Sequence, residues 1–217
     1  MWAYIKDNKI EQIYQRPKSL VLGEVRYPSN MFTKYTDAEK AAIGIYPVED
    51  SGKKGDDRFE YTSGPTYTWS ASDKKVTTSY TITEKSLVDV EAKDEDGNNI
   101  LDKKGNKTYN YGLKTVAKNL AKQQANNYIA RFNWLVERSI YDSSKAITDA
   151  VKTYVAAIKT DCAEIETAID NASDMTAFKK LYQDIYNYDS DGEIVSVKTV
   201  ARVNRWSDDY DVQQYVR

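Results

Sequence analysis

The most constraining feature of the sequence is the absence of glycine and proline from residues 113–188. Because these two residues end or kink helices, a stretch of this length that lacks both favours helix. Apolar side chains recur in it at intervals of three and four residues, as in helices with one buried face. The first stripe comprises Leu113, Val116, Leu120, Tyr128, Phe132, Leu135 and Val136. The second stripe comprises Ile147, Val151, Tyr154, Ile158, Cys162, Ile165 and Ile169.

A break separates the two stripes at Ser143-Ser144, where a serine can also serve as the N-cap of the second helix. The second stripe covers only about three heptads, so we predict a helical hairpin in place of an extended coiled coil. Ser173 is placed to cap a third, shorter helix. That helix would carry Phe178, Leu181, Tyr182 and Ile185. Residues 113–188 are therefore predicted to form a helical region.

The first 48 residues predict a small β unit with one short helix. Strand-like runs surround a turn at Asp7-Asn8, and Thr36 and Glu39 form a capping box. We expect the helix to span about residues 37–43, since Gly44 supplies a left-handed stop.

The region 49–112 is predicted to be a meander of antiparallel strands. It opens with residues 49–57, which are polar, contain two glycines and form the best candidate for a linker. Strand-like runs follow, and Asp96-Gly97 and Lys104-Gly105 mark turns between them.

The region 189–217 is predicted to be a C-terminal β arm and tail, because Val195 and Val197 alternate there with polar residues. The four regions together predict an α+β fold: an N-terminal antiparallel β-rich part, a helical hairpin plus a third helix, and a C-terminal β arm.

Composition excludes several chemistries. The chain has no histidine, so no imidazole can act as a base or a metal ligand, and its one cysteine, Cys162, forms no internal disulfide. With a formal net charge of −2, the chain is a poor nucleic-acid binder. No run approaches the ~18 apolar residues of a membrane span, so we expect no membrane insertion. The opening residues also lack the apolar run of a signal peptide.

Two acidic clusters resemble metal-binding loops only in part. Asp94, Asp96 and Asn98 have the spacing that begins a calcium-binding loop, but Asn99 and Gly105 occupy the positions that require glycine and glutamate. We therefore predict a hairpin turn there. The second cluster, at residues 189–193, lacks a bidentate carboxylate at the right distance. The sequence predicts no metal, no cofactor and no enzymatic activity.

A basic stripe is expected on the helix that begins near residue 113, where Lys114, Lys118 and Lys122 recur every fourth residue. The default interpretation is a solvated face. The next helix ends in four acids that oppose its dipole, namely Asp161, Glu164, Glu166 and Asp170. The three lysines could neutralise these acids, either within the same chain or from another copy of it.

Tyrosine is the most informative residue type, with 18 copies alongside four tryptophans. Such rings suit surfaces that are apolar and still form hydrogen bonds, as in contacts between proteins or with sugars. Half-buried strand positions account for many of them. The candidate interface residues are Trp69, Tyr67, Tyr109, Tyr111, Tyr188, Val195, Val197, Trp206, Tyr210 and Tyr215.

The chain resembles small tail proteins of tailed bacteriophages, of the tail-fibre-associated or tail assembly chaperone-like type. The opening MWAYIKDNKI and the segment from Tyr35 to Val48, which ends in GIYPV, resemble the start of such proteins. The segment ARFNWL at residues 130–135, followed by Ile147, Val151 and Tyr154, is similar to their helical region. The chain keeps Tyr154 but lacks the tryptophan and arginine that usually accompany it in the chaperones.

The resemblance implies a virion protein without enzymatic activity, made in the host cytoplasm. It would be a structural component at the tail, baseplate or fibre junction, in contact with several copies of other virion proteins. An assembly chaperone that is absent from finished particles is the alternative. The residues also leave open a carbohydrate-binding module that uses Trp69 and neighbouring tyrosines.

Overall fold

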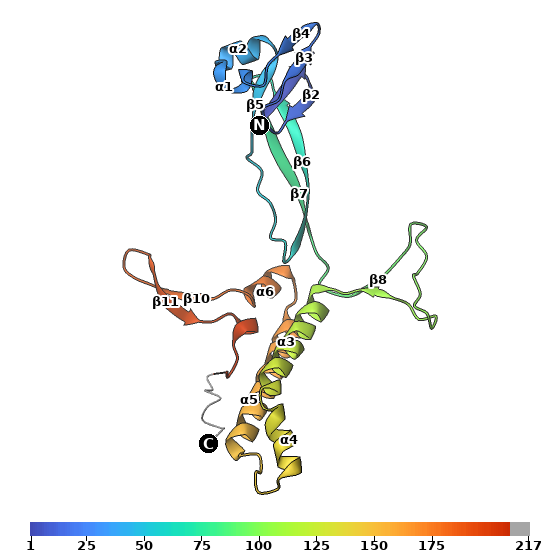
Figure 1. Cartoon of the computed structure of the whole chain (residues 1–217), viewed down its shortest axis with the longest axis vertical. Coiled ribbons are helices and arrows are strands. Elements are labelled where there is room, and N and C mark those ends of the chain that lie inside the picture. Colours follow the sequence, from blue (N-terminus) through green and yellow to red (C-terminus); the bar gives the residue numbers. More distant parts are fainter. Residues whose placement is uncertain (209–217) are drawn as a thin grey trace. The chain divides into compact units, whose positions relative to one another are not determined.

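The computed structural model describes residues 1–208, and the two candidate residues Tyr210 and Tyr215 lie outside them. The fold is α+β, as predicted (Figure 1). The chain divides into two compact units, Met1–Glu84 and the residues from Lys85 onward.

The first unit is built on a five-stranded sheet of order β2-β1-β5-β7-β6. Its strands are β1 (Trp2–Lys6), β2 (Lys9–Tyr14), β5 (Ile45–Glu49), β6 (Glu60–Ser70) and β7 (Lys75–Glu84). Strand β5 is antiparallel to β1 and parallel to β7. The other pairs are antiparallel hairpins, and Asp7 and Asn8 form the predicted turn with positive φ angles of 49° and 64°. A separate small hairpin joins β3 (Leu20–Leu22) to β4 (Val25–Tyr27).

Two short helices precede β5, where the sequence predicted one. Helix α2 (Asp37–Ala42) has the predicted capping box: the Glu39 backbone N–H donates to Thr36 Oγ1 at 3.3 Å, and the Thr36 N–H donates to Glu39 Oε2 at 2.7 Å. Gly44 ends it with a φ of 78°. Helix α1 (Met31–Lys34) was not predicted, because it has neither a side-chain cap nor a helical repeat. Its Met31 and neighbouring Phe32 are buried in the core with β1, β2 and β5.

The predicted linker, residues 49–57, packs along the β6–β7 hairpin. Thr78 Oγ1 donates to Asp50 Oδ1 at 2.7 Å, and the Gly55 N–H donates to Thr62 Oγ1 at 3.0 Å. The predicted division between residues 48 and 49 thus does not coincide with the structural one, which follows Glu84. The reason is the pairing of β5 with β7, which joins residues far apart in sequence into one sheet.

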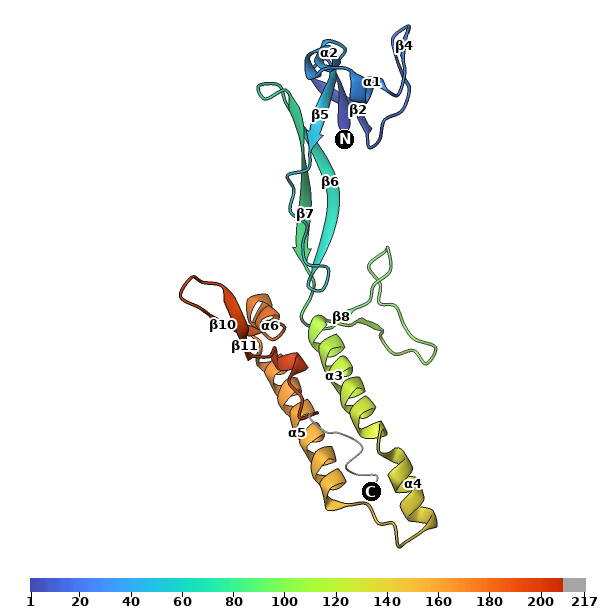
Figure 2. The ribbon, with the colours of Figure 1, turned by 60° about the vertical axis from the view of Figure 1, so that its left-hand side comes forward.

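The second unit contains the predicted helical hairpin. Its helices are α3 (Leu113–Ala130), α4 (Asn133–Tyr141), α5 (Asp149–Asn171) and α6 (Met175–Lys180). Figure 2 shows α3 and α5 side by side in opposite directions. The caps differ from the prediction: Thr148 caps α5 in place of Ser143-Ser144, and Asp174 caps α6 in place of Ser173. Within residues 1–208 no helix is long and apolar enough to cross a bilayer.

The second stripe is confirmed from Val151 to Ile169, but the first is wrong at two positions of α3. All of the predicted α5 residues from Val151 to Ile169 are buried. On α3 the buried side chains are Ala117, Ala121 and Ala125. The predicted Val116 and Leu120 are 42% and 57% exposed. Small alanines allow α3 to approach α5, and the larger side chains are left on the outside.

The end of the predicted helical region is also wrong, because α6 ends at Lys180 and residues 185–188 form a strand. That strand, β10 (Ile185–Tyr188), pairs with β11 (Ile194–Thr199) in a two-stranded antiparallel sheet. A 3₁₀ turn, η1 (Arg202–Asn204), follows β11. A further two-stranded sheet, β8 (Val90–Glu91) with β9 (Tyr109–Asn110), precedes α3.

Candidate interaction surfaces

Residues 89–110 form a compact arrangement of hairpins, here named the three-hairpin junction. The β8–β9 pair is its stem, and two loops, residues 93–99 and 101–107, extend from it. Three backbone hydrogen bonds close a ring at its centre, each 2.9 Å long. The Ile100 N–H donates to the Ala92 carbonyl, the Thr108 N–H to that of Ile100, and the Ala92 N–H to that of Thr108.

The two loops have the same local structure. In the first loop Asp94 Oδ1 accepts from the backbone N–H groups of Asp96 at 3.0 Å and Asn98 at 2.8 Å. These contacts confirm the predicted hairpin turn, because the Asp94 carboxylate accepts hydrogen bonds from the backbone of the turn. In the second loop Asp102 accepts in the same way, and the hydrogen bond from the Asn106 N–H lowers the pKa of Asp102.

A shared sequence pattern explains the likeness. Both loops contain Asp-x-x-Gly-Asn, offset by eight residues, and both glycines have a φ of 84°. This short repeat was missed at the sequence level, although the eight-residue offset is a signal that identifies it. The turn between β10 and β11 uses a related pattern, in which Asp189 accepts from the N–H groups of Asp191 and Glu193 at 2.9 Å each.

The three-hairpin junction lacks a hydrophobic core of its own. Among residues 89–110, all of which the structure describes, Ala92 is the one buried side chain. The apolar side chains exposed at or beside the junction are Val88, Val90, Ile100, Leu101, Tyr109 and Tyr111. Two of them, Tyr109 and Tyr111, are predicted interface residues that the structure places on the surface, with Tyr111 67% exposed. Hydrogen bonds and turn chemistry therefore define the shape of this module.

The junction is attached to the start of α3 by backbone contacts. The Gly112 N–H donates to Asp89 Oδ1 at 2.7 Å, and the Leu113 N–H donates to the Ser86 carbonyl at 2.9 Å. A side chain on Gly112 would collide with the backbone of Val88. Glycine is thus required where the module meets the helix.

The β10–β11 hairpin is a second exposed apolar surface. The predicted candidates Tyr188, Val195 and Val197 all lie on it and are exposed, Val195 by 62%. Ile185 and Ile194 are exposed beside them. The sheet has two strands, so within the described residues each strand has one edge without a strand partner. Unpaired edges with apolar side chains are typical of sites where another chain adds a strand.

The segment that follows β11 docks on the helices of its own chain. Ala201 is buried, and the predicted candidate Trp206 packs edge-on against Tyr128 of α3, with ring centroids 5.5 Å apart. Tyr154 of α5 donates to Asp208 Oδ1 at 2.7 Å, and Arg131 forms an ion pair with the same carboxylate at 2.9 Å. Burial raises the pKa of Tyr154, and the hydrogen bond to Asp208 raises it further. Trp206 therefore belongs to an internal contact.

The lysines of the basic stripe are paired with acidic residues of α5 in the same chain. This is the first of the two arrangements that the sequence left open, the other being a contact with another copy. Lys118 forms an ion pair with Asp170 at 2.8 Å, and Lys122 pairs with Glu166 at 3.3 Å. Lys114 donates to the Asp170 carbonyl at 3.0 Å. The hydrogen bond to Asp170 raises the pKa of Lys118. These contacts tie the start of α3 to the end of α5.

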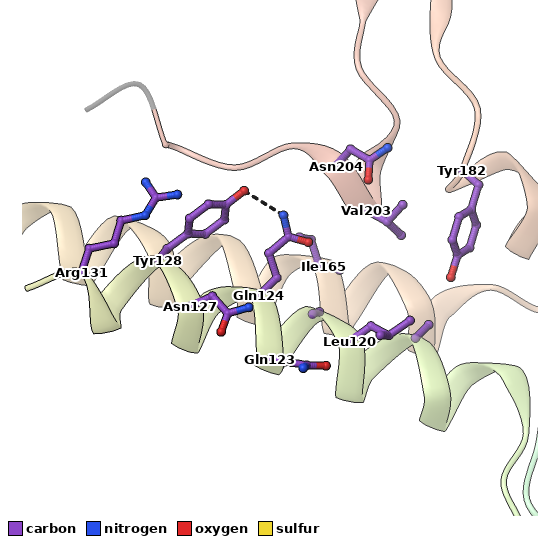
Figure 3. Close-up of a pocket in the computed structure, with 12 residues that line it drawn as sticks. Leu120, Gln123, Gln124, Asn127, Tyr128, Arg131, Ile165, Tyr182, Val203 and Asn204 are labelled. Atoms are coloured by element: carbon purple, nitrogen blue, oxygen red, sulfur yellow. Dashed lines mark hydrogen bonds between the residues drawn. The ribbon is translucent and has the colours of Figure 1, made fainter. Parts of the chain in front are cut away.

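A groove of about 490 Å³ lies between α3 and the docked C-terminal segment (Figure 3). Its walls combine apolar and amide side chains, among them Leu120, Gln123, Asn127, Ile165 and Val203. Figure 3 shows Gln124 donating to the Tyr128 hydroxyl, at 2.7 Å.

The remaining candidates, Trp69 and Tyr67, lie in the first unit and are half-buried. The Trp69 indole N–H donates to Asn8 Oδ1 at 2.8 Å, and its ring packs on Tyr46 at a centroid distance of 4.5 Å. Both residues pack against the core formed by Ala3 and its neighbours. Their main contacts are thus internal to the sheet.

Reactive groups are sparse in the part of the chain that the structure describes. No cluster of three or more acidic or cysteine side chains that could hold a metal ion occurs among residues 1–208. Cys162 is buried on α5, and burial raises the pKa of its thiol. A buried thiol with a raised pKa is a weak nucleophile.

Comparisons with protein-family models, with curated proteins and with solved structures gave no match.

Proposed function

We propose that this protein is a structural component of a tailed-bacteriophage virion, located at the tail, baseplate or fibre junction, that acts by binding other proteins. The observation that carries the proposal is the pair of exposed modules in the second unit. The three-hairpin junction and the β10–β11 hairpin present apolar side chains on well-defined backbones that enclose no core. The phage setting is supported by the resemblance of residues 1–48 and 113–185 to tail proteins.

Physical chemistry supports docking at these modules. Exposed apolar side chains gain free energy when a partner covers them, at about 25 cal/mol per Å². The turns are already fixed by the hydrogen bonds of Asp94, Asp102 and Asp189, so little conformational entropy is lost on binding. Such preorganised surfaces suit permanent contacts in an assembly.

Mass spectrometry of purified particles tests the role. A structural component is present in stoichiometric amounts. If the protein is made in infected cells but is absent from finished particles, the proposal fails and an assembly chaperone replaces it. The sugar-binding alternative gains no support from Trp69, whose indole N–H and ring are already engaged.

A paired substitution tests the β10–β11 surface. Val195→Thr with Val197→Thr keeps the shape and strand propensity of both residues but replaces two exposed methyl groups by hydroxyls. We expect this variant to fold normally and to enter particles less efficiently. Val195→Ile with Val197→Ile, which stays apolar, is the matched control and should enter as the wild type does. Equal incorporation of both variants would exclude this hairpin from the contact.

A further inference from the structure

We propose that the protein self-associates through the three-hairpin junction, with the first loop of one copy docked against the second loop of another. This goes beyond the proposed function, because it requires a second copy of this chain and no other virion protein. It rests on three properties of the two loops: their common backbone, their opposite charges and the apolar residues between them.

The loops match in shape and oppose in charge. Residues 93–99 carry three acidic side chains and one basic side chain, and residues 101–107 carry one acidic and three basic. At equivalent positions Glu95 corresponds to Lys103, and Asp96 corresponds to Lys104. All four of these side chains are exposed. Each copy thus presents an acidic loop beside a basic loop of the same form.

The opposite charges do not meet within one copy. The two loops diverge from β8 in both views (Figures 1 and 2). Lys107 forms an ion pair at 2.6 Å with Glu91, a residue of the β8–β9 stem. The four residues at the loop tips therefore remain available to complement a second copy.

A twofold arrangement satisfies both loops at once. In a symmetric dimer the contact from the first loop to the second is repeated in the reverse sense, so every tip charge faces an opposite charge. Ile100 lies between the loops and Leu101 begins the second loop; both are exposed, so the same contact covers them. The apolar side chains supply affinity, while the charges select orientation and partner.

Charge reversal on the full-length protein tests this directly. Glu95→Lys with Asp96→Lys makes both loops basic, and Lys103→Glu with Lys104→Glu makes both loops acidic. Neither pair touches Asp94 or Asp102, whose side chains hold the turns, so both variants should fold. Combining all four substitutions exchanges the charges of the loops and provides the matched control.

Sedimentation velocity at low salt gives the readout. We expect the wild type and the four-substitution variant to dimerise, and each two-substitution variant to dimerise about a hundredfold more weakly or worse, because like charges then face each other. Mixing the two weak variants should restore association. Association of the wild type should weaken in about 1 M salt, where the screening length falls to about 3 Å.

Two results would overturn the inference. One is a wild type that stays monomeric at low salt across the concentrations at which it remains soluble. The other is equal association of the wild type and both two-substitution variants, which would place any dimer contact elsewhere. Either result leaves the particle composition untouched, so the proposed function is judged separately by mass spectrometry.

Discussion

Two neighbouring residues of α3 provide the sharpest test of the helical packing. Leu120 is 57% exposed, whereas Ala121 is 8% exposed and belongs to the alanine face. Full burial of a leucine side chain is worth about 1.5–3 kcal/mol, so the buried fraction of Leu120 contributes about 1 kcal/mol. The higher helix propensity of alanine offsets a few tenths of that. We therefore expect Leu120→Ala to lower the free energy of unfolding by less than about 1 kcal/mol.

The reverse substitution should be the damaging one. Ala121→Leu adds three carbons at a buried position, which forces α3 away from its neighbour at a cost of about 1–3 kcal/mol. Ile158→Ala on α5 serves as the reference for a true core position, since Ile158 is 0% exposed. Truncation of the Ile158 side chain should lower the free energy of unfolding by about 2–5 kcal/mol.

Urea denaturation followed by far-ultraviolet circular dichroism measures all three variants. The expected order of destabilisation places Leu120→Ala well below both others. The reasoning is refuted if Leu120→Ala costs as much as Ile158→Ala while Ala121→Leu costs nothing, because the large side chains of α3 would then form the packed face.

Three further predictions follow from single contacts. Tyr154→Phe removes the hydrogen bond to Asp208 and should lower the free energy of unfolding by about 1–2 kcal/mol, measured by urea denaturation. Because folding raises the pKa of the Tyr154 hydroxyl, the wild type should also lose stability above about pH 10 more steeply than the variant does. Parallel pH profiles of the two proteins would contradict this. Gly44→Ala places a Cβ 2.6 Å from a backbone oxygen of β1, at a residue whose φ is 78°, and should lower the free energy of unfolding by at least about 1 kcal/mol. Gly23→Ala should cost less, because Gly23 has a φ of 63° and a Cβ there would have no atom within 4 Å. The Cys162 thiol should react with a disulfide reagent slowly in the native protein and quickly in denaturant; fast native reaction would show that it is accessible.

Local signals in the sequence were sufficient where the structure is decided locally. The capping box of Thr36, the stop at Gly44 and the turn at Asp7-Asn8 depend on residues within one or two turns of chain, and all three are present. The apolar stripe of α5 was also readable, because its large side chains repeat at helical spacing and all face inward.

The candidate surface was predictable only in part. Tyr109, Tyr111, Tyr188, Val195 and Val197 are exposed, as a contact with another protein requires. Trp69, Tyr67 and Trp206 contact their own chain, because an aromatic side chain suits a half-buried position as well as an interface. Composition alone does not distinguish the two.

The sequence by itself determined the α+β class, the helical hairpin and the local caps and turns, since hydrophobic spacing and backbone preference act over a few residues. The tertiary structure decided which face of α3 is packed, that β5 pairs with β7, and that residues 185–188 form a strand. Each of these depends on a partner distant in the chain: alanines are selected by the close approach of α5, and a strand is selected by the edge it joins. The free energy of these long-range contacts exceeds the local backbone preference, so a short segment of the sequence does not reveal their outcome.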